Sequence, residues 1–124
     1  MSVRAVVFDF GNVIAFFDHR RFTSRVAPYA RRTEQEIFDF IYGGEFETRF
    51  ERGQIPPEEF LDIVCRDCGI TCPTASVREW FCDVFWLNPE VVELIPRLAR
   101  QLPLLLVSNT NALHAGHFVP RFWH

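Results

Sequence analysis

Two short apolar runs lie near opposite ends of the chain, and each one ends in small polar residues. The first covers residues 5–8 and is followed by Asp-Phe-Gly-Asn at residues 9–12, and the second covers residues 104–107 and is followed by Ser-Asn-Thr-Asn at residues 108–111. Continuous runs of Val, Leu and Phe are typical of buried parallel strands, and Gly and Asn tolerate tight turns. The pattern therefore predicts two parallel strands, with Asp9 at the carboxyl end of the first.

Residues 16–87, between these strands, show mainly the helical period of about 3.6 residues. A Thr-Glu-Gln-Glu capping box at residues 33–36 begins one predicted helix, which ends near Tyr42 because two Gly residues follow it. Pro57 and Gly69 bound the next helix, since Pro favours the first turn of a helix and Gly favours its end.

Further helices are predicted towards the second strand. A capping box at residues 76–79 predicts a helix that continues through Phe85, and Asn88, followed by Pro, opens a helix that ends near Arg100. In open α/β sheets the carboxyl edge of the strands is where ligands bind. The order of the elements therefore predicts an α/β chain in which a helical insertion of residues 16–87 divides two strand-bearing parts, residues 1–15 and 88–124.

The polar residues after the two strands carry a family resemblance. Residues 9–12, Asp-Phe-Gly-Asn, and residues 108–111, Ser-Asn-Thr-Asn, resemble the first two motifs of the haloacid dehalogenase-like (HAD) hydrolase superfamily, in particular a phosphatase branch. Residues 45–60 resemble the Glu-Arg-Gly-x-Ile segment in the helical cap of that branch. The resemblance implies a HAD-like Rossmannoid core with an inserted α-helical cap, of which this chain would hold an incomplete core with about two parallel strands.

The resemblance also implies roles for individual residues. In the family the first-motif Asp attacks phosphorus and forms an aspartyl phosphate, so Asp9 would be the nucleophile and a Mg²⁺ ligand. Gly11 would offer its backbone carbonyl to Mg²⁺, and Ser108 with the Asn109 N–H would bind the phosphoryl group of a small phosphorylated metabolite. Positioning and charge neutralisation are what phosphoryl transfer needs. Two more residues are candidates for substrate contact or for holding the turns, Asn12 and Asn111.

The sequence departs from the family pattern at two points. Most family phosphatases have a second Asp, the general acid and base, where this chain has Gly11, so the proton-transfer residue is unassigned. The family also uses a Lys and an acidic pair further along, whereas all 13 basic residues here are Arg. We therefore expect a truncated chain that is inactive alone. Two other functions stay open, a haloacid dehalogenase that uses the same Asp without metal, and a non-catalytic fragment.

Charge and hydropathy exclude some classes of partner. The net charge of −3 offers no basic footprint for nucleic acid. No segment approaches the ~18 apolar residues of a membrane span, and Asp9 interrupts the N-terminal apolar run, unlike a signal peptide. We expect a cytoplasmic protein with no membrane partner. Two strands without further neighbours would leave open edges, so self-association through exposed sheet edges is also expected.

The cysteines and two histidines allow competing interpretations. Cys65, Cys68 and Cys72 have the spacing of zinc ligands, but Cys65 falls on the apolar face of a predicted helix and Cys68 at its end. We therefore expect thiols rather than disulfides or a zinc site. His114 and His117 are three residues apart, and we expect a surface pair rather than a metal pair.

Overall fold

The computed structural model describes residues 2–122, and the chain divides into two compact units. The strand unit comprises the chain up to residue 17 together with residues 85–109, and the helical unit comprises residues 18–84 and the chain from residue 110 onward. This division differs from the sequence-based one mainly in the last helix, which groups with the helices of residues 18–84. The physical cause of this difference is packing, because the last helix contacts a helix of the helical unit.

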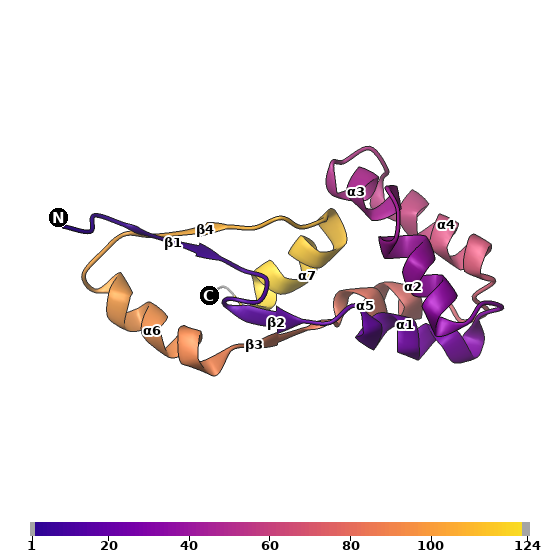
Figure 1. Cartoon of the computed structure of the whole chain (residues 1–124), viewed down its shortest axis with the longest axis horizontal. Coiled ribbons are helices and arrows are strands. Elements are labelled where there is room, and N and C mark those ends of the chain that lie inside the picture. The colour runs from indigo at the N-terminus through magenta and orange to yellow at the C-terminus, as the bar shows by residue number, and fades with distance from the viewer. Residues whose placement is uncertain (1, 123–124) are drawn as a thin grey trace. The chain divides into compact units, whose positions relative to one another are not determined.

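The strand unit is built on the two parallel strands that the sequence predicted. β1 (Val6–Asp9) pairs in parallel with β4 (Leu104–Val107), in a register that places Phe8 opposite Leu106 and Asp9 opposite Val107 (Figure 1). Among the described residues this sheet has two strands, in the order β1-β4. The mixed α/β class and the incomplete parallel sheet are therefore confirmed.

A second strand pair in this unit was not predicted from the sequence. β2 (Ala15–Phe17) pairs antiparallel with β3 (Phe85–Leu87). Phe16 lies opposite Trp86, with ring centroids 6.0 Å apart. The prediction of a helix through Phe85 was therefore wrong, because cross-strand aromatic pairs favour the extended backbone there.

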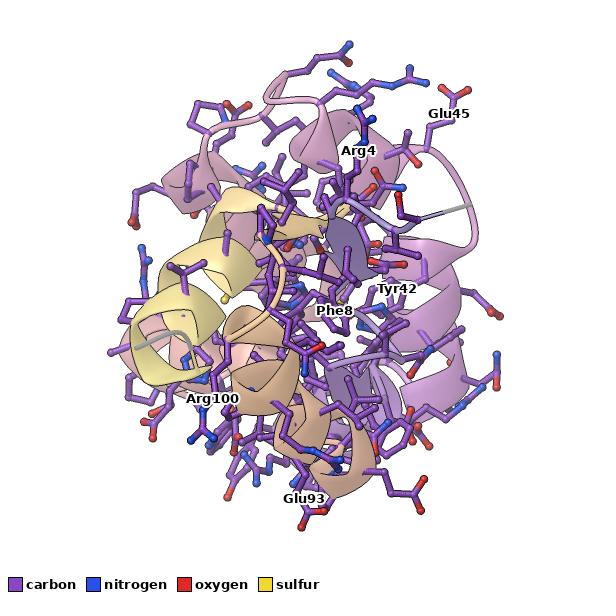
Figure 2. All side chains as sticks on the ribbon, turned by 90° about the vertical axis from the view of Figure 1, so that its left-hand side faces the viewer. Arg4, Phe8, Tyr42, Glu45, Glu93 and Arg100 are labelled. Carbon is purple, nitrogen blue, oxygen red and sulfur yellow. The ribbon has the colours of Figure 1, made fainter. Side chains whose placement is uncertain are left out.

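One face of the β1–β4 sheet is open to solvent. Val7, Leu105 and Val107 alternate with better covered neighbours and are 58%, 56% and 62% exposed. α6 (Pro89–Ala99) begins as predicted after Asn88, and it has no buried residue. Phe8 is only 9% exposed, whereas Figure 2 shows Glu93, on this helix, projecting outward.

The helical unit begins with α1 (Arg20–Val26), the 3₁₀ turn η1 (Ala27–Tyr29) and α2 (Glu34–Tyr42). The predicted capping box at α2 is confirmed, since the Thr33 hydroxyl accepts from the Glu36 N–H and the Glu36 carboxylate accepts from the Thr33 N–H, both at 3.2 Å. α2 ends at Tyr42, as predicted, and Gly43 follows it.

Three further helices follow, α3 (Phe46–Glu51), α4 (Pro57–Cys68) and α5 (Thr74–Cys82). α4 has the predicted limits, and Gly69 ends it in the left-handed conformation with a φ of 63°. The predicted capping box at residues 76–79 was wrong. α5 begins two residues earlier, after Pro73, whose fixed φ suits the residue that precedes a helix.

Aromatic side chains fill the core of the helical unit. Phe60 stacks on Phe50 with a centroid distance of 4.1 Å, and it packs against Phe81 at 5.1 Å. Phe81 meets Phe22 edge to face at 5.3 Å, and Phe22, Phe60 and Phe81 are fully buried. These contacts join α1, α3, α4 and α5, and α7 (Ala112–Phe122) packs against α5. No helix within residues 2–122 combines the length and hydropathy of a membrane span.

Candidate functional site

Asp9 stands at the carboxyl end of β1, where the sequence predicted it. Its backbone lies opposite Val107, the last residue of β4, so Ser108 follows directly at the same edge of the sheet. Neighbouring strands lie about 4.8 Å apart, which brings these strand ends close together. The Asp9 side chain is exposed, and its Oδ1 accepts a hydrogen bond of 2.7 Å from the Phe10 N–H.

The turn after Asp9 is held by backbone hydrogen bonds. The Phe10 carbonyl accepts from the N–H groups of Ile14 and Ala15, each at 3.0 Å, and the Asn12 N–H donates to the Ala15 carbonyl at 2.7 Å. Asn12 adopts a φ of 60°, a left-handed conformation that Asn tolerates better than most residues. The position of Asn12 is therefore explained by the turn alone.

Gly11 lies in this turn where space is short. A Cβ atom at this position would lie 3.0 Å from the ring of Phe17, which belongs to the same unit. The bridge between Gly11 and Ala15 uses the Phe10 carbonyl and the Asn12 N–H, so neither of its two bonds occupies the Gly11 carbonyl. That carbonyl and the Asp9 carboxylate are hard oxygen donors of the kind that Mg²⁺ prefers, so these residues fit the ion.

The Ser-Asn-Thr-Asn segment is divided between the two units. Ser108 and Asn109 belong to the strand unit, where Ser108 is half-buried and Asn109 is exposed. Thr110 and Asn111 belong to the helical unit, and Asn111 is 3% exposed. The Asn111 Oδ1 accepts from the His114 N–H at 2.9 Å, which is the hydrogen bond of a helix N-cap. Asn111 is therefore the N-cap residue of α7.

His114 lies in the interior of the helical unit, so the prediction of a surface histidine was wrong. It is 4% exposed and stacks on the ring of Phe81 at 4.4 Å. Its Nδ1 lies 3.0 Å from the Asn111 Nδ2, and its Nε2 lies 3.0 Å from the Phe81 carbonyl oxygen. Burial, reinforced by nearby His19, lowers the pKa of His114 to about 3, although the Phe81 carbonyl opposes the shift. The ring is therefore neutral at physiological pH.

A sequence signal for this role existed. An N-cap side chain can accept a hydrogen bond from the N–H three residues later, and Asn111, the last residue of the polar segment, has that spacing to His114.

The second histidine, His117, is half-buried and lines a cavity of about 360 Å³ between α5 and α7, together with Arg78 and Glu79.

Other titratable groups cluster where α1, α2 and α3 meet. The rings of His19 and Tyr42 stack at 4.2 Å. Burial lowers the pKa of His19, partly offset by Asp18, and burial together with Glu47 raises the pKa of Tyr42. Burial, with added repulsion from Glu51, raises the pKa of Glu47 to about 8. The Tyr42 hydroxyl and the Glu47 Oε2 are buried and have no hydrogen-bond partner among the described residues.

All four cysteines are free, and Cys68 and Cys82 are buried. Burial raises the pKa of Cys68 to about 11. The buried Cys82 Sγ lies 3.4 Å from the Leu113 carbonyl, to which it donates. Within residues 2–122 no group of three or more His, Cys, Asp and Glu side chains is arranged to hold a metal.

Several solved structures of HAD family proteins match this chain. An enzyme of that family from Bacteroides thetaiotaomicron, solved in complex with magnesium and inorganic phosphate, matches 97% of this chain with a TM-score of 0.78 and 21% sequence identity. The chain has a partial HAD-like fold. A predicted HAD-like family hydrolase from Porphyromonas gingivalis matches 90% of it with a TM-score of 0.68 and 25% identity. No protein-family model matches the sequence.

The HAD-like fold is present here in part. The chain spans 60% of the length of the Bacteroides enzyme and 53% of the Porphyromonas protein. Within the described part, the fold brings Asp9 and Ser108 to the same sheet edge and places Gly11 in the adjoining turn. Asn111 lies in a buried helix cap of the helical unit.

Proposed function

We propose that these residues carry the nucleophile and the phosphate-binding segment of a Mg²⁺-dependent phosphatase that acts on a small phosphorylated metabolite. The observation that carries this proposal is the position of Asp9 and Ser108 at adjacent carboxyl ends of two paired parallel strands. The likeness to an enzyme solved with magnesium and inorganic phosphate supports the same ligands for this chain. We further propose that residues 16–87 act as the cap of a core that includes residues 1–15 and 88–124.

Asp9 is the proposed nucleophile because its carboxylate is exposed and already oriented. Its Oδ1 accepts a hydrogen bond of 2.7 Å from the Phe10 N–H. Attack on phosphorus forms a bond to one Asp9 oxygen while the ester oxygen of the substrate leaves. Water then cleaves the aspartyl phosphate and releases inorganic phosphate. The Ser108 hydroxyl and the Asn109 N–H are proposed to hold the phosphoryl oxygens during both steps.

The proposed metal ligands are the Asp9 carboxylate and the Gly11 backbone carbonyl. Mg²⁺ bound by one or two protein oxygens usually keeps several waters and contacts phosphate, and it supplies neutralisation of the phosphoryl charge. Since Gly11 stands where most family phosphatases have an acid and base residue, the proton donor to the leaving group is not assigned to a residue of this chain.

The test measures phosphate binding by the 124-residue chain itself. Inorganic phosphate is titrated with and without Mg²⁺, and the backbone amide signals of Asp9, Ser108 and Asn109 are followed by NMR. We expect saturable, Mg²⁺-dependent shifts at these residues. Asp9→Asn should abolish the Mg²⁺ dependence, and Ser108→Ala should weaken binding more mildly because the Asn109 N–H remains.

The matched control is Asp67→Asn, which removes the same charge from an exposed position on α4. It should bind phosphate like the unaltered chain. Shifts that persist unchanged in Asp9→Asn would remove Asp9 from the site. Release of halide from a 2-haloacid without Mg²⁺, dependent on Asp9, would replace the phosphatase with a dehalogenase.

A further inference from the structure

The cavity between α5 and α7 is a feature of the helical unit alone, because both helices belong to that unit. Its volume is about 360 Å³. A single buried water needs only about 10–15 Å³, and pockets that bind small molecules measure about 300–1,000 Å³. The cavity is therefore large enough for a small organic molecule.

Gly116 keeps one wall of this cavity open. A Cβ atom built at this position would meet no other atom within 4 Å. Glycine in the interior of a helix is unfavourable because of its backbone freedom, and no close contact requires it at this point of α7. The space beside Gly116 can therefore receive either a ligand or a larger side chain.

Two side chains of opposite charge line the cavity from α5. Arg78 and Glu79 share one face of the helix with Cys82, which follows them by four and three residues. One Arg78 nitrogen, Nη2, donates to the Glu58 carboxylate, and its other N–H groups have no partner within residues 2–122. The Glu79 carboxylate forms no ion pair in the same part of the chain. The cavity thus offers free N–H donors and an unpaired carboxylate.

The inner wall of the cavity is apolar. Cys82 and Leu113 line it and are 6% and 5% exposed. The Cys82 thiol donates to the Leu113 carbonyl at 3.4 Å, so these two polar groups bond each other. Ala75 and Ala112 add methyl groups to the lining. This wall suits a short aliphatic group that forms no hydrogen bonds.

We propose that this cavity binds a small aliphatic α-amino acid, with its carboxylate on Arg78, its ammonium group on Glu79 and its side chain against Cys82 and Leu113. A planar guanidinium matches the geometry of a carboxylate. A lone anion would be repelled by Glu79 and a lone cation by Arg78, so a ligand that carries both charges is favoured over either. The proposal does not rest on the proposed phosphatase function.

The first experiment compares three ligands that share an isopropyl group. L-valine, isovalerate and L-valinamide are each titrated into the 124-residue chain, and the backbone amide signals of Arg78, Glu79 and Gly116 are followed by NMR. We expect saturable shifts with L-valine. Isovalerate lacks the ammonium group and L-valinamide lacks the carboxylate, so each should bind at least about tenfold more weakly. Equal affinity for isovalerate and L-valine would show a simple anion site and would overturn the proposal.

The second experiment removes each charge from the protein. Arg78→Gln should weaken the binding of L-valine and of isovalerate alike. Glu79→Gln should weaken L-valine binding about tenfold and should not weaken isovalerate binding, since isovalerate has no group for Glu79 to bind. The matched controls are Arg66→Gln and Glu59→Gln at exposed positions on α4, and both should bind normally. Unchanged L-valine affinity in either cavity variant would contradict the proposal.

The third experiment fills the cavity. Gly116→Leu should abolish L-valine binding while helical circular dichroism is retained. Gly44→Leu is the matched control, because a Cβ atom at Gly44 also meets nothing within 4 Å, and it should bind normally. If Gly116→Leu fails to fold, the Arg78 and Glu79 variants still decide the question. Binding that persists in folded Gly116→Leu, or no saturable L-valine binding by the unaltered chain, would overturn the proposal.

Discussion

The raised pKa of the half-buried Glu47 carboxyl predicts that the helical unit loses stability as the pH rises above neutrality. Burial, with repulsion from Glu51, raises the pKa of Glu47 from its ordinary value of 4.5 to about 8. A carboxyl whose folded pKa is raised binds more protons in the folded state, so between these values the free energy of unfolding decreases with increasing pH. Two groups face Glu47. Glu51 raises the pKa of Glu47 further, and Tyr42, whose own pKa is raised, stays neutral, so neither group stabilises the charged carboxylate.

His114 acts in the opposite direction at lower pH. Its pKa falls from 6.5 to about 3 in the folded state, so the unfolded chain binds more protons and stability decreases as the pH falls through this window. Between pH 4.5 and 6.5 the two effects oppose each other, and the His114 effect fades as the pH rises above 6.5. The raised pKa of Cys68 lowers stability only as the unfolded thiol, with an ordinary value of 9.0, begins to ionise, so the range from pH 6.5 to 8.5 reports mainly on Glu47.

The expected loss follows from the Glu47 shift. One proton per molecule corresponds to about 1.4 kcal/mol per pH unit, which gives at most about 2 kcal/mol between pH 6.5 and 8.5. Because Glu47 is only partly buried and solvent screens it, we expect about 1 kcal/mol.

The assay is urea unfolding followed by helical circular dichroism across this pH range. Glu47→Gln, which cannot titrate, should remove the alkaline decrease. Glu59→Gln, at an exposed position on α4, should retain it. A flat profile in the unaltered chain, or an unchanged decrease in Glu47→Gln, would refute the reasoning.

Three other predictions follow from the fold. Thr33→Ala removes the capping hydroxyl of α2 and should cost about 1 kcal/mol of stability, measured by urea unfolding, whereas Thr33→Ser should cost little; equal losses would argue against the cap. The cysteines should bind no structural metal, so chelator should leave the helical circular dichroism unchanged, and stoichiometric zinc that is lost together with structure would contradict this. The 124-residue chain alone should hydrolyse p-nitrophenyl phosphate far below a normal enzymatic rate. It should also self-associate in sedimentation experiments, because its sheet exposes Val7, Leu105 and Val107. Robust Mg²⁺-dependent turnover by a monodisperse monomer would refute both expectations.

Strong local signals made much of the fold predictable from the sequence. The apolar runs gave β1 and β4, and the Thr33 capping box and Gly69 gave helix limits, because each signal depends on a few neighbouring residues. The β2–β3 pair was missed because its strands are three residues each and lie far apart in the chain. Phe85 fits a helical period as well as an aromatic cross-strand pair, so only the tertiary partner decides between them.

The candidate site was predictable to a similar extent. The strand-end positions of Asp9 and Ser108 follow from local patterns, and pairing of their strands brings them to one edge. The burial of His114 was not predictable in the same way, because it depends on packing of α7 against Phe81, which lies 33 residues earlier. The same packing explains why the last helix groups with the helical unit.

The most direct test of the central claim asks whether Asp9 accepts a phosphoryl group. Beryllium trifluoride forms an acyl-phosphate-like adduct with a suitably placed carboxylate, and ¹⁹F NMR detects the bound species. We predict a Mg²⁺-dependent adduct on the unaltered chain and on Asp67→Asn, and none on Asp9→Asn. An adduct of equal intensity on Asp9→Asn, or its absence from the unaltered chain under saturating Mg²⁺, would contradict the assignment of Asp9 as the nucleophile.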